Sequence, residues 1–192
     1  MIQIIKHTYK PVHDMSVRKS TKRIILHCSA TPDGKDYTCE QIDTWHKQRG
    51  YAEIGYHFVI YRDGSIHQGR PIVFKGAHTY NNNYDSIGIC YIGGMDAENV
   101  RAKDTRTPAQ TQSILELIKT LMLYYGKLSI HGHYEYSAKK CPSFDVTQII
   151  KLLSILLLFV MSITGCKSGM HTTETVLLPQ IHHSSIYSSQ ID

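Results

Sequence analysis

Three candidate metal ligands most constrain the fold, because a chain that uses them together must join distant parts of its sequence. His27 lies near the end of the strand-like run Arg23–Cys28, and His133 and Cys141 follow about a hundred residues later. Two imidazoles and one thiolate form a zinc site whose fourth tetrahedral position is open to water, which is typical of catalytic sites. The pattern therefore indicates a metal-dependent hydrolase, in which a strand end lies beside a loop from far along the chain.

The composition is that of one domain of ordinary size followed by a tail. With 42% hydrophobic and 19% charged residues among 192, the chain can bury a core without the help of disulfides. Its five cysteines are an odd number and include no Cys-x-x-Cys pair, which argues against a disulfide-stapled secreted domain and against a zinc finger. The net charge of +5 suits an anionic polymer such as a cell wall or nucleic acid, without choosing between them.

Apolar runs and turn residues predict several strands. The β-branched run 23–28 is typical of a buried strand, and further strands are expected at 55–61, 66–69 and 86–92. The sequence Asp63-Gly64 favours a tight hairpin turn between the second and third of these strands, since glycine adopts positive φ at little cost.

Capping residues predict two helices. Thr38 and Thr107 each precede a glutamine by three residues, which is the spacing of a capping box. Gly50 and Gly126 are expected to end these helices. Strands and helices mix without a strict βαβ rhythm, so we expect an α/β fold with a central mixed β-sheet flanked by helices.

We divide the chain into four parts. Residues 1–22 are expected to form an N-terminal leader with an edge strand near Ile2–Ile5, residues 23–148 the catalytic domain, 149–166 an apolar segment and 167–192 a disordered tail. The uncharged run Leu152–Gly165 is shorter than the roughly 20 residues of a membrane span. Because it has no polar face, we favour a membrane anchor or a lipoprotein-like signal ending at Cys166 over a helix packed on the domain.

Several short motifs, in one order from about residue 23 to residue 146, resemble the zinc N-acetylmuramoyl-L-alanine amidases of the bacteriophage T7 lysozyme type. That family shares its fold with peptidoglycan recognition proteins. The matching motifs are His27-Cys28-Ser29-Ala30-Thr31, Trp45-His46-Lys47, Gly55-Tyr56-His57-Phe58, Arg62-Asp63-Gly64, Ser86-Ile87-Gly88, Thr107-Pro108-Ala109-Gln110 and Lys139-Lys140-Cys141-Pro142-Ser143-Phe144-Asp145.

The resemblance implies that His27, His133 and Cys141 bind one Zn²⁺ ion per chain. The sequence departs from the family pattern at Tyr134, where the phage protein has a second histidine. His131 is an alternative ligand, although the spacing to Cys141 favours His133.

The resemblance also implies catalytic roles for Tyr56 and Lys139. A lysine beside the metal offers positive charge where negative charge develops on the substrate. His78 falls where the family has a histidine in the substrate-binding groove. The implied reaction is hydrolysis of the amide between the lactyl group of muramic acid and the first L-Ala of the peptidoglycan stem peptide.

Two alternatives to the enzyme remain open. A non-catalytic module that binds peptidoglycan in the same groove is disfavoured, because Tyr56, Lys139 and Cys141 are all present. A regulatory contact with a phage RNA polymerase is neither supported nor opposed by these residues. We expect a monomeric phage or prophage lysin whose partner is peptidoglycan, with no nucleic acid. We also expect it to be made in the bacterial cytoplasm without an N-terminal signal peptide, to act at the cell wall, and to contact a membrane through Leu152–Gly165.

Overall fold

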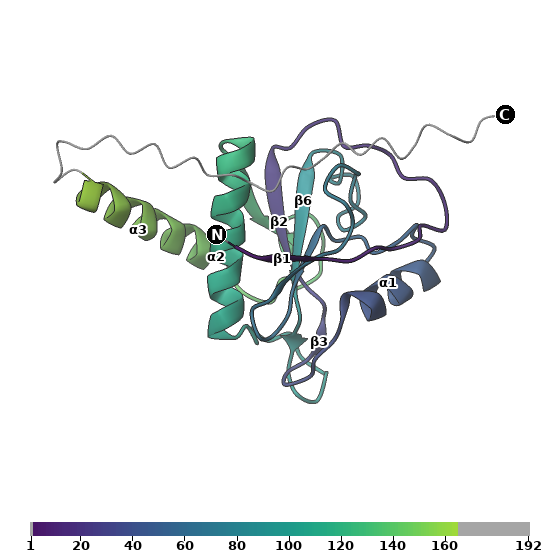
Figure 1. Ribbon diagram of the computed structural model, residues 1–192. Coiled ribbons are helices and arrows are strands. Elements are labelled where there is room, and N and C mark those ends of the chain that lie inside the picture. Colours follow the sequence, from purple (N-terminus) through teal and green to yellow (C-terminus); the bar gives the residue numbers. More distant parts are fainter. Residues whose placement is uncertain (1, 165–192) are drawn as a thin grey trace. The chain divides into compact units, whose positions relative to one another are not determined.

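A mixed six-stranded sheet forms the centre of the fold (Figure 1). The computed structural model describes residues 2–164. In spatial order the strands are β1 (Ile4–Lys6), β5 (Ile66–Gln68), β4 (Phe58–Ile60), β6 (Ser86–Tyr91), β2 (Arg23–Cys28) and β8 (Ser129–Gly132). Neighbouring strands are parallel except β4 and β5, which form the predicted hairpin. The expected α/β class with a mixed sheet is confirmed.

Helices cover the sheet on both sides, and smaller elements lie around them. Helices α1 (Cys39–Gln48) and α2 (Pro108–Tyr125) lie on opposite faces (Figure 1). A separate parallel pair joins β3 (Thr31–Pro32) to β7 (Gly94–Met95). The 3₁₀ turn η1 (His133–Glu135) and the helix α3 (Thr147–Thr164) follow β8.

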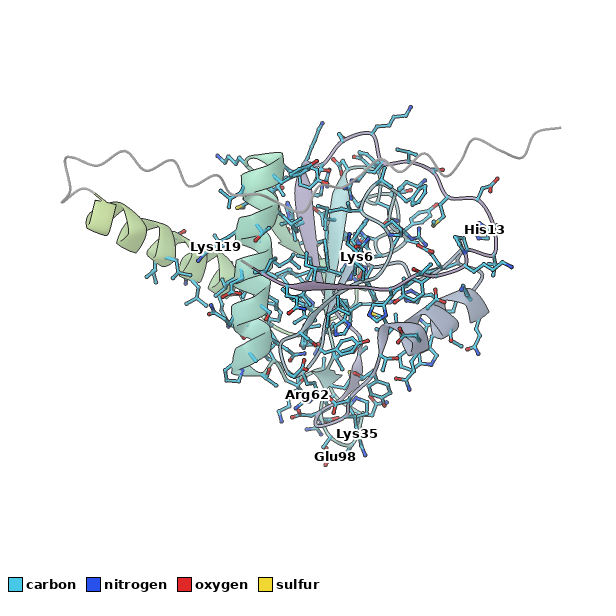
Figure 2. All side chains as sticks on the ribbon, viewed as in Figure 1. Lys6, His13, Lys35, Arg62, Glu98 and Lys119 are labelled. Carbon is cyan, nitrogen blue, oxygen red and sulfur yellow. The ribbon has the colours of Figure 1, made fainter. Side chains whose placement is uncertain are left out.

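The two-residue period of the strands sorts their side chains between two cores. Ile24 and Leu26 of β2 pack on the larger core with the apolar face of α2, whereas Val59 and Cys90 pack on the opposite core with Ile42 of α1. The side chain of His27 belongs to the α1 side, because it alternates with Leu26. Exposed charged side chains such as Lys35 and Glu98 lie at the periphery (Figure 2).

Both predicted capping boxes are confirmed. The Thr38 hydroxyl accepts the Gln41 amide proton, and the Gln41 side chain accepts from the Thr38 backbone. Thr107 and Gln110 make the same pair of bonds at the start of α2. Gly126 caps the end of α2 at a φ of 77°. Local sequence therefore determines where these two helices begin and where α2 ends.

The first residues of the described chain pack on the domain. β1 pairs with β5 at the edge of the sheet, and Val17 bridges Phe74. The guanidinium of Arg18 donates to the carbonyl of Ser86 at 3.2 Å and lies 3.2 Å from Nε2 of His57. The sequence predicts an edge strand here but not these long-range contacts. Through β1, the segment predicted as a leader adds a strand to the sheet.

The apolar segment begins as part of the core. A compact unit extends to Leu157. Within it Ile149 and Leu153 of α3 are 0% and 6% exposed and join the larger core. Among residues 2–164, no helix is long and apolar enough to cross a membrane. The expected membrane contact thus has no support here, and Cys166 and the predicted tail lie outside the described residues.

Candidate metal centre

Three elements bring His27, His133 and Cys141 together. One ligand atom from each residue lies within 4.8 Å of the others. His27 lies near the carboxyl end of β2, and His133 is the first residue of η1, directly after β8. Since β2 and β8 are parallel neighbours, their carboxyl ends meet at one edge of the sheet. Cys141 reaches the same edge from the loop between η1 and α3.

Backbone hydrogen bonds hold the Cys141 loop against the strand ends. The Tyr134 N–H donates to the carbonyl of Cys141 at 2.7 Å, which ties the loop to η1. The Cys28 N–H donates to Sγ of Cys141 at 3.3 Å. One residue further on, the buried Tyr91 hydroxyl donates to the carbonyl of Pro142 at 2.8 Å. The thiol therefore sits on a fixed backbone although it lies in a loop.

The spacing of the ligand atoms fits a zinc ion. Sγ of Cys141 lies 3.7 Å from Nδ1 of His27. In a tetrahedral site, a nitrogen ~2.0 Å and a sulfur ~2.3 Å from zinc are about 3.5 Å apart. Two imidazoles and one thiolate are also a donor set that zinc accepts, with one position left open. The residues present thus suit the metal that the sequence predicts.

Nε2 of His27, the ring nitrogen that faces away from Cys141, is hydrogen-bonded. Nε2 of His27 lies 3.0 Å from Nδ1 of His78 and 3.3 Å from the hydroxyl of Thr79. If Nε2–H donates to His78, the lone pair on Nδ1 of His27 faces Cys141. Such outer partners set the tautomer and orientation of metal-binding histidines. Sequence reasoning missed Thr79, whose one signal is its position directly after His78.

His78, which the resemblance assigns to the substrate-binding groove, lies against His27. Its side chain is buried, only 9% exposed, and packs edge-on against His27 with ring centroids 5.0 Å apart. Gly76 and Gly88 leave room for this ring, because a Cβ at either residue would collide with the His78 imidazole. The ring therefore lies behind a candidate ligand.

His131 points away from the other candidate ligands. Its Nδ1 pairs with the Glu135 carboxylate at 2.6 Å, and its Nε2 lies 3.0 Å from the Ser129 hydroxyl. Both ring nitrogens are thus occupied by other partners. Of the two competing histidines, the structure brings His133 to His27 and Cys141.

Burial sets the protonation of the candidate ligands. The pKa of His27 is lowered well below its usual value by burial, and then by His133. Burial and the Lys139 charge lower the pKa of His133 in the same direction. Both imidazoles are therefore neutral near pH 7, the form that binds a metal. The neighbouring Cys28 thiol and burial raise the pKa of Cys141, so its thiol would lose a proton on binding metal.

Tyr56 and Lys139 are both near the candidate ligands. The Tyr56 ring is half-buried with its centroid 5.1 Å from that of His27, and burial raises the pKa of Tyr56 well above its ordinary value. Lys139 is exposed and lines a pocket of about 620 Å³ together with Lys140, Tyr134 and Phe144. One residue thus offers a protonated hydroxyl and the other a cation beside an open pocket.

The sequence matches known proteins over about two thirds of its length. Residues 17–144 match the family described as N-acetylmuramoyl-L-alanine amidase. The endolysin of Escherichia phage T7 is 40% identical over 129 residues, which cover 67% of this chain and 85% of the phage protein. The endolysin of Klebsiella phage KP32 is 38% identical over the same share of each chain.

Solved structures show the same fold. The N-acetylmuramoyl-L-alanine amidase LysC from Clostridium intestinale superposes with a TM-score of 0.70 at 29% identity, over 80% of this chain and 99% of that one. A Drosophila peptidoglycan recognition protein, PGRP-SD, matches in fold alone, with a TM-score of 0.64 at 20% identity over 74% and 89% of the two chains. By its sequence and its fold, the chain belongs to the N-acetylmuramoyl-L-alanine amidase family.

Proposed function

We propose that this protein is a zinc-dependent lysin that hydrolyses the amide between the lactyl group of muramic acid and L-Ala in peptidoglycan. The observation that carries the proposal is the convergence of His27, His133 and Cys141, whose ligand atoms lie within 4.8 Å of one another. A zinc ion held by these three residues supplies Lewis-acid chemistry at its open position. The relatives named endolysin support a cell wall as the place of action.

The protein side chains around the open position have separate tasks. Lys139 places positive charge where the scissile carbonyl oxygen becomes negative, which is the usual means of stabilising such an oxyanion. Tyr56 keeps its proton near neutral pH, because burial raises its pKa, and can donate a hydrogen bond to the reacting groups. His78 holds the imidazole of His27 in the orientation that presents Nδ1.

The pocket beside Lys139 suits a substrate that carries carboxylates. Its volume of about 620 Å³ accommodates a fragment of substrate, and its charged lining consists of the two lysines Lys139 and Lys140 and one carboxylate, Asp145. Stem peptides carry carboxylates, which lysine ammonium groups attract. We therefore place the stem peptide along this pocket, with the scissile amide toward Cys141.

The test combines metal content with product analysis. Wild-type protein should bind zinc through these ligands and release free stem peptides from muropeptides. Cys141→Ser should lose most of this activity, whereas Cys90→Ala, a buried cysteine outside the ligand group, controls for loss of a thiol. Intact muropeptides despite bound zinc would favour the non-catalytic binding module. Full activity of Cys141→Ser would disprove the proposed metal site.

A further inference from the structure

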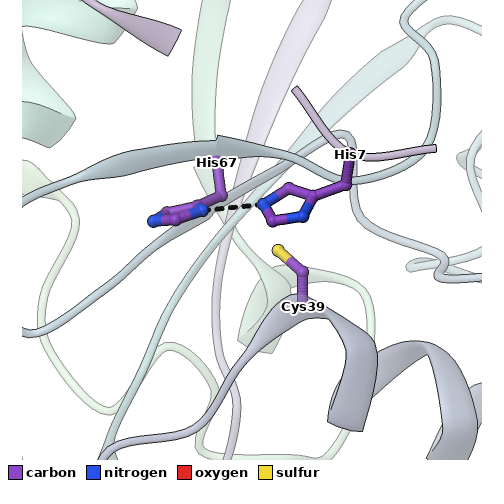
Figure 3. Close-up of side chains that lie close together, drawn as sticks. All are labelled: His7, Cys39 and His67. Atoms are coloured by element: carbon purple, nitrogen blue, oxygen red, sulfur yellow. Dashed lines mark hydrogen bonds between the residues drawn. The ribbon is translucent and has the colours of Figure 1, made fainter. Parts of the chain in front are cut away.

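A second group of candidate ligands shares no residue with the first. His7, Cys39 and His67 each offer one ligand atom within 4.8 Å of the other two (Figure 3). His7 directly follows β1, Cys39 is the first residue of α1, and His67 lies in the middle of β5. Three separate elements thus bring two imidazoles and one thiol to one place.

Outer hydrogen bonds turn the two imidazoles toward each other with their lone pairs facing. The Glu40 carboxylate lies 2.7 Å from Nδ1 of His7, so it accepts the proton on that nitrogen. Ser65 donates its hydroxyl proton to Asp63 at 2.6 Å, and its oxygen therefore accepts from Nε2–H of His67 at 2.8 Å. This leaves Nε2 of His7 and Nδ1 of His67 as the facing pair.

The facing nitrogens are 2.8 Å apart (Figure 3). Two lone pairs at that distance repel each other unless a cation lies between them. A proton on one ring or a metal ion can fill that role. Nitrogens ~2.0 Å from one tetrahedral ion are about 3.3 Å apart, so a metal requires the rings to separate by about half an ångström. His7 is half-buried beside a three-residue edge strand, where such a shift is readily accommodated.

The third residue of the group, Cys39, favours a bound metal ion over a proton shared by the two histidines. Cys39 is fully buried and burial raises the pKa of its thiol to about 11. The Tyr9 hydroxyl is also buried and has no hydrogen-bond partner in the described part of the chain. Burial, followed by the Cys39 thiol, raises the pKa of Tyr9. A metal ion between the imidazoles would also give the buried thiol a partner, which a shared proton would not.

We propose that His7, Cys39 and His67 form a second metal site, which binds a zinc-like divalent cation and fastens the N-terminal segment to the domain. Zinc accepts this donor set, and the Tyr9 hydroxyl or a water completes four positions. On binding, the Cys39 thiol releases its proton to solvent and becomes the thiolate ligand. Glu40 and Ser65 act as outer partners that orient the two imidazoles.

The site has a structural consequence for the sheet edge. β1 is only three residues long and pairs with β5 alone. A metal bound by His7, Cys39 and His67 would link this edge to both α1 and β5. Because a structural metal contributes its binding free energy to folding, loading the site should raise the thermal unfolding midpoint.

Cobalt absorption can separate this site from the first one. Metal-depleted full-length Cys141→Ser is titrated with Co²⁺, and thiolate-to-cobalt charge transfer is recorded in the near ultraviolet. Since Cys141 is absent, we expect the remaining band to come from Cys39. The band should disappear in Cys141→Ser/Cys39→Ser and persist in Cys141→Ser/Cys90→Ala. A Cys141→Ser protein without the band, or a double variant that keeps it, would overturn the proposal.

A second variant covers the case in which loss of Cys39 prevents folding. His7→Gln removes a half-buried side chain at the sheet edge and leaves the core intact. In the Cys141→Ser background it should weaken cobalt binding at least about tenfold, since losing a ligand costs no less than losing an outer-shell partner. An unchanged cobalt affinity would show that the histidines share only a proton.

Discussion

Nε2 of His27 lies 3.0 Å from Nδ1 of His78, on the side of the His27 ring that faces away from Cys141. His78 itself is buried, and Ser86 lies 3.4 Å from its other nitrogen. A chain of polar groups thus runs from the sheet interior to the candidate ligand. We infer that His78 is a positioning residue, which acts through His27 and does not contact substrate.

We expect His78→Ala to lower zinc affinity by about 10- to 100-fold, because outer partners of metal-binding histidines contribute that much. His78→Asn should recover part of the loss, since its carbonyl oxygen can accept from Nε2–H of His27. Competition with a chromogenic chelator measures both constants, and the exposed His13→Ala is the control (Figure 2). Wild-type zinc affinity in His78→Ala would refute the positioning role.

Lys139 and Lys140 are adjacent lysines for which we predict different effects on catalysis. Lys139→Met should lower kcat by about 10²- to 10³-fold, the usual cost of removing one oxyanion-stabilising group, without loss of zinc. Lys140→Met is the matched comparison: it should keep kcat within a few-fold of wild type and raise KM, because Lys140 lines the substrate pocket. Steady-state kinetics on purified muropeptides, with zinc content measured in parallel, distinguishes the two. Equal losses in both variants would assign the effect to general surface charge.

Substitutions at the adjacent residues Ile149 and Ile150 test whether the start of α3 packs on the domain. Ile149 is 0% exposed and packs on the larger core, whereas Ile150 is 41% exposed. Ile149→Ala should therefore reduce the free energy of unfolding by about 2–4 kcal/mol, the range for emptying a buried isoleucine site. Ile150→Ala should change it by less than about 1 kcal/mol. Urea denaturation of both variants provides the values, and similar stabilities would mean that this turn of α3 does not pack.

Local signals in the sequence predicted the regular elements well. The Thr38 and Thr107 capping boxes, the Asp63-Gly64 hairpin and the run at β2 each depend on neighbouring residues, and each appears in the structure. Contacts between distant segments were harder to predict. The sequence predicts an edge strand near Ile2–Ile5, but the pairing of β1 with β5 joins residues far apart in sequence and has no local signal.

In the candidate site, too, some features could be predicted from the sequence and others depend on contacts between distant segments. Residue type suggested His27, His133 and Cys141, and the resemblance to the amidase family implied that they act as one group, which the structure brings together. The location of His78 behind His27 depends on Gly76 and Gly88, whose missing side chains matter only once the strands are paired. The group at His7, Cys39 and His67 was missed, since its members come from three elements without motif spacing.

His57 should make folding stability depend on pH. Burial, followed by the Arg18 charge, lowers its pKa to about 3. Its Nδ1 accepts from the Gly88 N–H at 3.0 Å, and its Nε2–H donates to the carbonyl of Phe74 at 3.1 Å. Both ring nitrogens of the neutral imidazole are therefore hydrogen-bonded. In the unfolded chain a histidine titrates near pH 6.5. Between about pH 6.5 and 3, the unfolded state therefore binds a proton that the folded state does not.

Stability should consequently fall on acidification through this window, by up to about 1.4 kcal/mol per pH unit from His57 alone. The free energy of unfolding of metal-depleted protein, measured in urea at several values between pH 7 and 4, tests the slope. His57→Gln should be less stable at pH 7, yet its slope should be shallower by about 1.4 kcal/mol per pH unit. His13→Gln, which removes an exposed histidine, provides the reference. An unchanged slope in His57→Gln would mean that this ring is not the buried neutral group described.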